Sequence, residues 1–130
     1  MIHLYHGDGK GKTTAAVGLA VRAAGSGMHV LFVQFFKDGS SSEVGVLASL
    51  PGVETRNPTV HHGLFRSMTD AQKAETRADS TALLQGVIAD AERFDLIVLD
   101  EVVSAYRHGM LDREALLAFL DAEGSAARSC

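Results

Sequence analysis

The sequence has few of the residues that carry covalent or aromatic chemistry: among 130 residues there are one cysteine, two tyrosines and no tryptophan. The single cysteine, Cys130, cannot form an internal disulfide, and a zinc site built on cysteines is excluded. This usage predicts a reducing compartment. Because the N-terminus does not resemble a signal peptide and no apolar run approaches bilayer length, we expect a cytoplasmic protein with no membrane partner.

Positive charge is also scarce. Lys and Arg total 12 against 16 Asp and Glu, which gives a formal net charge of −4 at pH 7. No basic tract is present to follow a phosphate backbone, and few aromatic side chains are available to stack on bases. We therefore expect no nucleic acid partner.

Short apolar segments alternate with longer helical patterns, which is typical of parallel strands joined by crossover helices. No repeat or linker divides the sequence, so residues 1–130 are expected to form one domain. The prediction is an α/β fold with three layers and a mainly parallel sheet. The expected strands are Ile2–Tyr5, His29–Phe36, Val53–Arg56 and Asp95–Asp100.

Four helices are expected between and after these strands. The first covers 12–24 and the second 42–50. The third is capped by Thr69, with Gln72 completing a capping box, and a last helix is capped by Asp112. An apolar stripe on the third helix predicts a buried face, and its other face is expected to be solvated. That polar face carries Lys73, Glu75, Arg77 and Asp79.

The segment HGDGKGKTT, residues 6–14, lies between the first expected strand and the first expected helix. Its glycines permit positive φ and allow successive N–H groups to point at one anion, and the helix adds the positive end of its dipole. Lys12 supplies a charge for phosphate oxygens and the Thr13 hydroxyl is placed to hold magnesium, so both are candidate catalytic residues. The alternative is a glycine-rich turn that binds nothing. The expected nucleotide-binding residues are Gly7, Asp8, Gly9, Lys10, Gly11, Lys12, Thr13 and Thr14.

A second signal is LIVLDE, an apolar strand that ends in Asp100 and Glu101. A buried strand would deliver both carboxylates to its carboxyl end beside the phosphate loop, where at least one of them is expected to bind magnesium, directly or through water. The alternative is an acidic strand end without a further role. His61 and His62 predict no metal site, because adjacent side chains in an extended loop diverge.

Three segments together resemble the ATP-dependent corrinoid adenosyltransferases, which have the phosphate-loop fold: HGDGKGKTTAAVGLAVRAAGSG, VLFVQFFKDG and DLIVLDEV. The resemblance runs through essentially the whole chain, and the family's loop likewise lacks the first glycine of the strict pattern, where His6 stands here. It implies transfer of the 5′-deoxyadenosyl group of ATP to the Co(I) centre of a reduced corrinoid, with triphosphate leaving, in adenosylcobalamin biosynthesis. The implied partners are the small molecules ATP and corrinoid, Mg²⁺, and an electron donor that reduces the corrinoid.

The same resemblance implies that aromatic side chains exclude water from the lower face of the corrinoid. Phe65 stands where the family carries such residues, although closing a small loop cluster against the long helix is an equal alternative. Phe36 and Lys37 follow the second expected strand, on the edge where ligands bind open α/β sheets. Of Phe35 and Phe36, one is expected in the core, and Gln34 is a candidate polar contact.

The end of the sequence departs from the family. The family continues into another buried strand with a TGR-type loop, whereas this sequence ends in AEGSAARSC. We therefore expect the C-terminal strand or strands of the family domain to be missing, with no strand after the helix that ends near Glu123. If that strand belongs beside the first one, an open sheet edge results, and low stability or self-association as a homodimer would follow.

Two other functions stay open from the sequence. A phosphotransferase or ATPase could use the same loop to cleave the terminal phosphate of ATP, and a nucleotide-binding fragment could bind ATP without turnover. A protein kinase is excluded, because the sequence has neither an HRD nor a DFG signature.

Overall fold

The computed structural model describes residues 2–5, 12–36, 42–123 and 128–129. Its centre is a sheet with the strand order β3-β2-β4-β1-β5, in which all neighbours pair in parallel. This arrangement confirms the predicted α/β fold with a parallel sheet. The strands are β1 (Ile2–Tyr5), β2 (Val30–Gln34), β3 (Val53–Arg56), β4 (Leu96–Asp100) and β5 (Arg128–Ser129).

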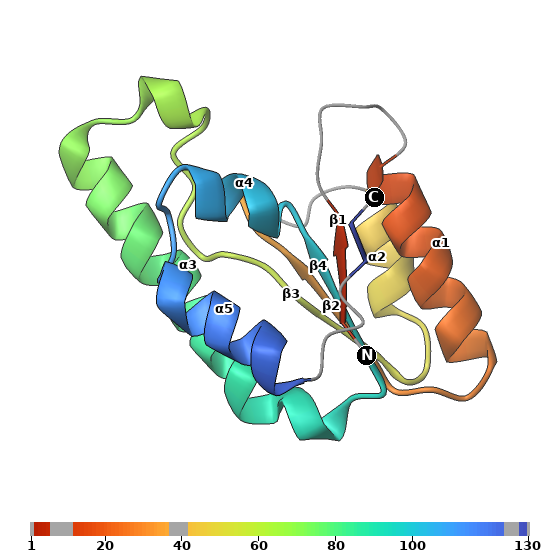
Figure 1. Ribbon diagram of the computed structural model, residues 1–130. Helices are drawn as coiled ribbons and strands as arrows, with labels where there is room; N and C mark the ends of the chain where they lie inside the picture. The colour runs from red at the N-terminus through yellow and green to blue at the C-terminus, as the bar shows by residue number, and fades with distance from the viewer. Residues whose placement is uncertain (1, 6–11, 37–41, 124–127, 130) are drawn as a thin grey trace.

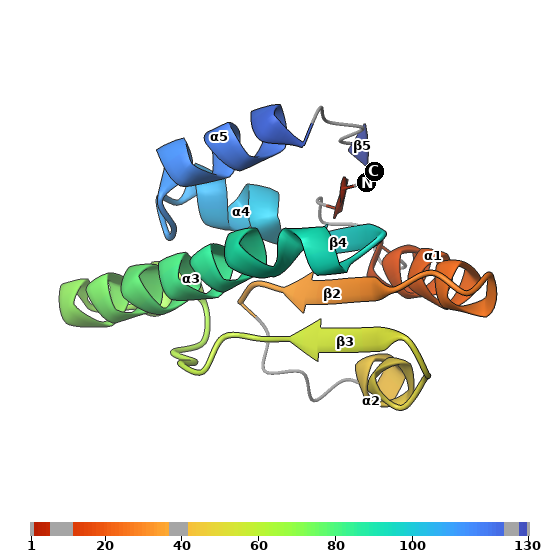
Figure 2. The same cartoon turned by 90° about the horizontal axis from the view of Figure 1, so that it is seen from below.

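Helices cover both faces of the sheet and give the three predicted layers (Figure 1). On one face lie α1 (Lys12–Gly25) and α2 (Ser42–Ala48). On the other lie α3 (Asp70–Asp90), α4 (Val102–Arg107) and α5 (Arg113–Ala122). The view in Figure 2 shows the long α3 running along the sheet beside β2 and β4. Two short 3₁₀ turns, η1 (Phe65–Ser67) and η2 (Ala91–Arg93), flank α3.

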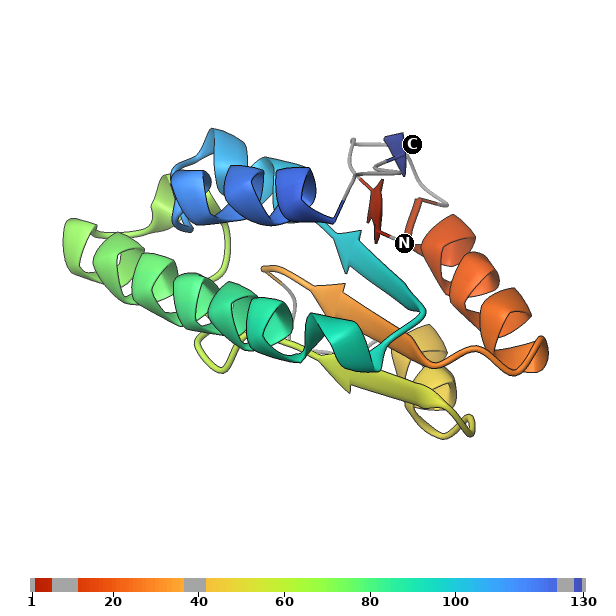
Figure 3. The same ribbon diagram turned by 60° about the horizontal axis from the view of Figure 1, so that its bottom comes forward.

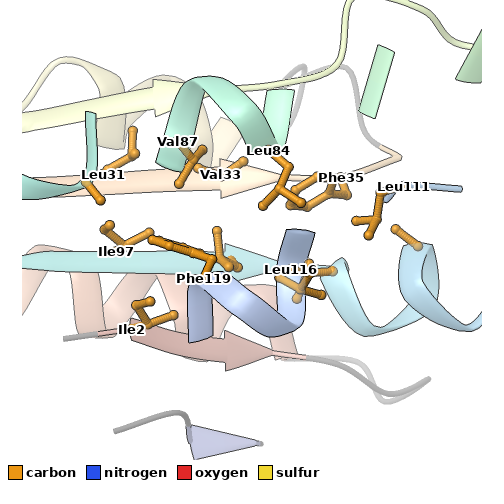
Figure 4. Close-up of a cluster of buried hydrophobic side chains, with 14 of the residues drawn as sticks. Ile2, Leu31, Val33, Phe35, Leu84, Val87, Ile97, Leu111, Leu116 and Phe119 are labelled. Carbon is orange, nitrogen blue, oxygen red and sulfur yellow. The ribbon is translucent and has the colours of Figure 1, made fainter. Parts of the chain in front are cut away.

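The two central strands explain why their sequences are almost entirely apolar. Every residue of β2 and of β4 is buried, because helices cover both faces of these strands. Their side chains alternate between two clusters of buried residues, one on each face. Figure 4 shows the larger cluster, in which Leu84 of α3 and Phe119 of α5 lie close to side chains from β2 and β4.

The ends of two helices are fixed by the predicted caps. Thr69 Oγ1 accepts a hydrogen bond from the Gln72 amide at 3.2 Å, and Gln72 Oε1 accepts one from the Thr69 amide at 2.9 Å. This reciprocal pair confirms the capping box of α3. At the start of α5, Asp112 accepts a hydrogen bond from the Ala115 amide at 3.1 Å, as predicted.

Three details differ from the sequence-based expectation. The second strand ends at Gln34 rather than Phe36, because Phe36 has φ 63° and turns the chain out of the extended conformation. The short helix α4 was not predicted as a separate element. The expectation of no strand after Glu123 was wrong: the two-residue β5 pairs with His3 and Leu4 on the far side of β1. Figure 3 shows that β5 occupies the edge that was expected to stay open.

None of the helices in these described ranges is both long enough and apolar enough to cross a membrane.

Candidate functional site

The site is organised by the carboxyl ends of three neighbouring parallel strands. β4 lies between β1 and β2, and its last residue, Asp100, is in register with Tyr5 on one side and Gln34 on the other. Because the strands are parallel, these three ends meet at one edge of the sheet, where open α/β sheets bind ligands. Helix α1 begins at the same end of the sheet (Figure 1).

Asp100 is the most tightly enclosed polar residue of this edge. It is completely buried, and its Oδ2 accepts a hydrogen bond from Gln34 Nε2 at 3.1 Å. The amide of Phe35 also donates to the Asp100 carbonyl oxygen at 3.0 Å, which continues the pairing of β2 and β4 beyond the end of β2. The end of β4 is therefore held by both main-chain and side-chain contacts.

Glu101 turns the chain directly from β4 into α4. It has φ 66° and ψ 11°, a left-handed conformation, and its side chain is half-buried. Phe36, just past the end of the neighbouring β2, has φ 63°. Each such non-glycine residue costs about 1–3 kcal/mol, and conformations of this kind gather at ligand sites. Two of them at adjacent strand ends mark this edge as the candidate site.

The predicted phosphate-binding residues can be placed only in part. Gly7, Asp8, Gly9, Lys10 and Gly11 lie outside the described residues, and so does Lys37. Lys12, Thr13 and Thr14 form the first turn of α1, as the sequence predicts. The positive end of the α1 dipole therefore lies at the carboxyl edge of the sheet, the end of the sheet that also carries Asp100.

The segment after β3 borders the same edge and is tied to two other elements. Asn57 Nδ2 donates to Gln34 Oε1 in a contact of 3.4 Å. The Asp79 carboxylate on α3 accepts from the amides of Thr59 and Val60 at 2.9 and 3.1 Å, and from the Thr59 hydroxyl at 2.6 Å. These contacts hold the start of this segment between the sheet and α3.

The polar face of α3 is exposed at Glu75 and Arg77, as its sequence predicts, and it also contacts other segments of the chain. Besides Asp79, Glu75 lies 2.8 Å from the Nε2 atom of His62, and Arg77 donates to two backbone carbonyl groups at 3.0 and 3.1 Å. Lys73 lies over the Phe65 ring, with Nζ 4.8 Å from its centroid. While partly exposed, this face of α3 also supports residues 59–65 and the turn between α4 and α5. No local pattern in the sequence predicts these contacts, because the residues that contact this face lie far from α3 along the chain.

Phe65 packs in a small cluster beside the long helix α3, which is the alternative that the sequence left open for it. Its ring meets the His108 ring edge-on, with centroids 4.3 Å apart and an angle of 73° between the planes. It also packs against the larger hydrophobic cluster, as does Phe36. Phe35 is fully buried, which confirms that one of the two adjacent phenylalanines belongs to the core. A corrinoid contact by Phe65 or Phe36 stays a prediction.

Comparison with known proteins identifies the family of the chain. The model of the family described as ATP:corrinoid adenosyltransferase BtuR/CobO/CobP matches residues 1–128. The chain belongs to this family.

Curated relatives carry the same family name. The chain is 35% identical over 124 residues to the corrinoid adenosyltransferase CobA of Salmonella typhimurium, and 33% identical over 130 residues to the corrinoid adenosyltransferase of Escherichia coli. It is 31% identical over 120 residues to that of Pseudomonas aeruginosa. These alignments cover 92–94% of the chain but only 59–61% of the relatives. The chain therefore spans about three fifths of the length of these adenosyltransferases.

The side chains at this edge have the chemistry that magnesium requires. Mg²⁺ prefers oxygen ligands and is usually held by one or two carboxylates together with substrate phosphates. Asp100 and Glu101 supply two carboxylates in succession at the end of β4, and Thr13 stands in the first turn of α1. Within the described ranges no group of three or more His, Cys, Asp or Glu is arranged to hold a metal ion. The donor set therefore fits an ion shared with a bound polyphosphate rather than a cage made by protein alone.

Proposed function

We propose that the chain transfers the 5′-deoxyadenosyl group of ATP to the cobalt of a reduced corrinoid and releases triphosphate. The observation that carries the proposal is the family match over residues 1–128, joined to an edge at which the start of α1 and the buried Asp100 share one end of the sheet. Such an edge suits ATP, because a helix N-terminus and a carboxylate-held ion together neutralise a polyphosphate.

The chemistry asks for positioning rather than for a protein nucleophile. Electron-rich Co(I) attacks the ribose C5′ atom, a cobalt–carbon bond forms, and the C5′–O bond breaks with its electron pair leaving on the triphosphate. The chain must hold the two substrates in line and stabilise the charge of the leaving group. Magnesium, when bound, would supply positive charge to the triphosphate oxygens.

Residues of this chain are assigned to these tasks as follows. Gly7 to Gly11 and Lys12 bind the triphosphate, and Thr13 with Asp100 and Glu101 holds magnesium. Phe36, Lys37 and Phe65 border the corrinoid. The reaction also needs an electron donor that reduces the corrinoid. We propose that the chain acts in the cytoplasm. A homodimer is also part of the proposal.

Product analysis tests the proposal directly. The chain is incubated with ATP, Mg²⁺ and a chemically reduced corrinoid, and the adenosylated corrinoid and the phosphate products are separated by chromatography. Adenosylcorrinoid and triphosphate are expected in equal amounts. ADP without triphosphate would instead identify a phosphotransferase or ATPase, and ATP binding with neither product would leave a nucleotide-binding function alone.

Substitution of Lys12 tests the phosphate-binding role. Lys12→Ala removes a charge-assisted contact worth about 1.5–3 kcal/mol, so ATP affinity should fall roughly ten- to a hundredfold. Arg22→Ala is the matched control, because it removes an exposed positive charge from the last turn of the same helix. Isothermal titration measures both. Equal ATP affinities for the two variants would contradict the assignment of Lys12.

A further inference from the structure

Gln34 is a buried polar residue for which the reaction itself assigns no task. It ends β2 and is only 1% exposed. Burying a side-chain amide is costly unless its groups are hydrogen-bonded. In Gln34 both halves have partners: Nε2 donates to Asp100 Oδ2 at 3.1 Å, and Oε1 accepts from Asn57 Nδ2 at 3.4 Å.

The contact with Asp100 permits only one orientation of the Gln34 amide. With the NH₂ group toward Asp100, a donor meets a carboxylate oxygen, and the amide oxygen meets the NH₂ group of Asn57. The flipped amide would place its oxygen against the Asp100 carboxylate, which only accepts hydrogen bonds, so that contact would become repulsive. Asp100 therefore fixes which side of the Gln34 amide faces it, and Asn57 contacts the other side.

We propose that Gln34 is a positioning residue that sets the plane of the Asp100 carboxylate for magnesium binding; this inference rests on the proposed function. A hydrogen bond to one lone-pair direction of Oδ2 restricts rotation of the carboxylate group about its Cβ–Cγ bond. Groups that orient a metal ligand in this way typically contribute ten- to a hundredfold to metal affinity. Gln34 itself needs no contact with ATP or corrinoid.

The two contacts of Gln34 also link the ends of three strands that are neighbours in the sheet. Asn57 directly follows β3, Gln34 ends β2 and Asp100 ends β4. The position of the segment after β3 is thereby coupled to the carboxylate at the phosphate-binding edge. Asn57 contacts Gln34, which in turn contacts Asp100, so the contribution of Asn57 by this route should be smaller than that of Gln34.

The test compares the magnesium dependence of ATP binding in variants of the full chain. Gln34→Met keeps the length of the side chain and removes the donor. The Mg²⁺ concentration that half-saturates ATP binding should rise at least about tenfold. ATP affinity measured without Mg²⁺ should stay the same. A merely structural role would weaken ATP binding with and without Mg²⁺ alike, and that result would overturn the proposal.

Two controls isolate the path through Asp100. Gln85→Met makes the same substitution at an exposed position of α3 and should leave the magnesium dependence unchanged. Asp100→Asn should raise the half-saturating Mg²⁺ concentration, and adding Gln34→Met to it should cause no further rise. A further rise in the double variant would overturn the proposal, because Gln34 would then act by another route.

Failure of this inference is distinguishable from failure of the proposed function. If the unaltered chain forms adenosylcorrinoid and Asp100→Asn changes the magnesium dependence while Gln34→Met does not, only the role of Gln34 is overturned. If Gln34→Met does not fold, Asn57→Ala supplies the test, with a smaller rise in the half-saturating Mg²⁺ concentration expected. An unchanged value for Asn57→Ala would then overturn the proposal.

Discussion

The two helical layers fill their interfaces with the sheet by different means. On the face covered by α1 and α2, α1 contributes small side chains: Ala16, Ala20 and Ala23 are buried at helical spacing. On the face covered by α3, α4 and α5, the buried side chains are large and interdigitate with the sheet (Figure 4). They include Leu84, Leu111, Leu116 and Phe119.

The difference matches what each layer has to do. Alanine side chains let α1 lie close to the strands, and α1 contacts β1, β2 and β4. The distance between α1 and the strands determines where the first turn of α1 lies, and that turn belongs to the candidate site. The other layer carries more of the apolar burial and therefore more of the stability. We infer that α1 positions the phosphate-binding part of the site and that the layer formed by α3, α4 and α5 contributes more to stability.

The largest effect is expected from shortening a buried side chain in the layer formed by α3, α4 and α5. Leu84→Ala removes a side chain that is fully buried between α3 and the sheet, and it should lower the free energy of unfolding by about 2–5 kcal/mol. Urea unfolding measures the change. Leu117→Ala is the matched control, because Leu117 is 51% exposed on α5. Similar losses in the two variants would show that buried apolar side chains do not carry the stability of this layer.

A substitution in α1, where it meets the sheet, should cause a smaller loss of stability and should also change the site. Ala20→Leu adds volume where α1 meets the sheet, which should cost about 1–3 kcal/mol and weaken ATP binding by displacing the start of α1. Urea unfolding and titration with ATP measure the two effects. Ala15→Leu, at an exposed position of the same helix, should change neither. If Ala20→Leu destabilises the fold but leaves ATP affinity unaltered, the packing of α1 on the sheet does not determine the geometry of the site.

Local patterns were sufficient for much of this fold. The apolar runs of β2 and β4 indicate strands buried on both faces, and every residue of both strands is buried. The spacing of Thr69 and Gln72 indicates the start of α3, because a capping box is made by residues three apart. The placement of Asp100 at the strand end follows from the same reasoning, since the carboxyl ends of parallel strands share an edge.

Features that depend on distant partners could not be predicted. Asp79 looks like any exposed carboxylate until residues 59 and 60, about 20 positions earlier, fold onto α3. Gln34 ends an apolar strand, and only the register between β2 and β4 brings it to Asp100. Helix α4 escaped prediction because it has only six residues and follows Glu101, which makes no side-chain cap and takes a left-handed turn.

The smallest effect is expected from a charged contact on the α3 side of the sheet. Arg56 of β3 hydrogen-bonds to Glu54 and to Asp90 at the end of α3, with an Arg56–Asp90 distance of 2.7 Å. This hydrogen bond lowers the pKa of Asp90 below its ordinary value of 3.8. The folded state therefore binds fewer protons than the unfolded state near that pH, so the contribution of Asp90 is complete at higher pH and is lost as the pH falls through the lowered pKa.

Comparing the unaltered chain with Asp90→Asn across this range tests the contact. The difference between their free energies of unfolding should be small at about pH 5, because ion pairs open to solvent on one side contribute little, and it should shrink further toward about pH 2. Urea unfolding at each pH measures it. A difference that stays constant over this range would show that the charge on Asp90 does not stabilise the fold. A difference as large as that of Leu84→Ala would mean that charged contacts, rather than large apolar side chains, hold the α3 layer on the sheet.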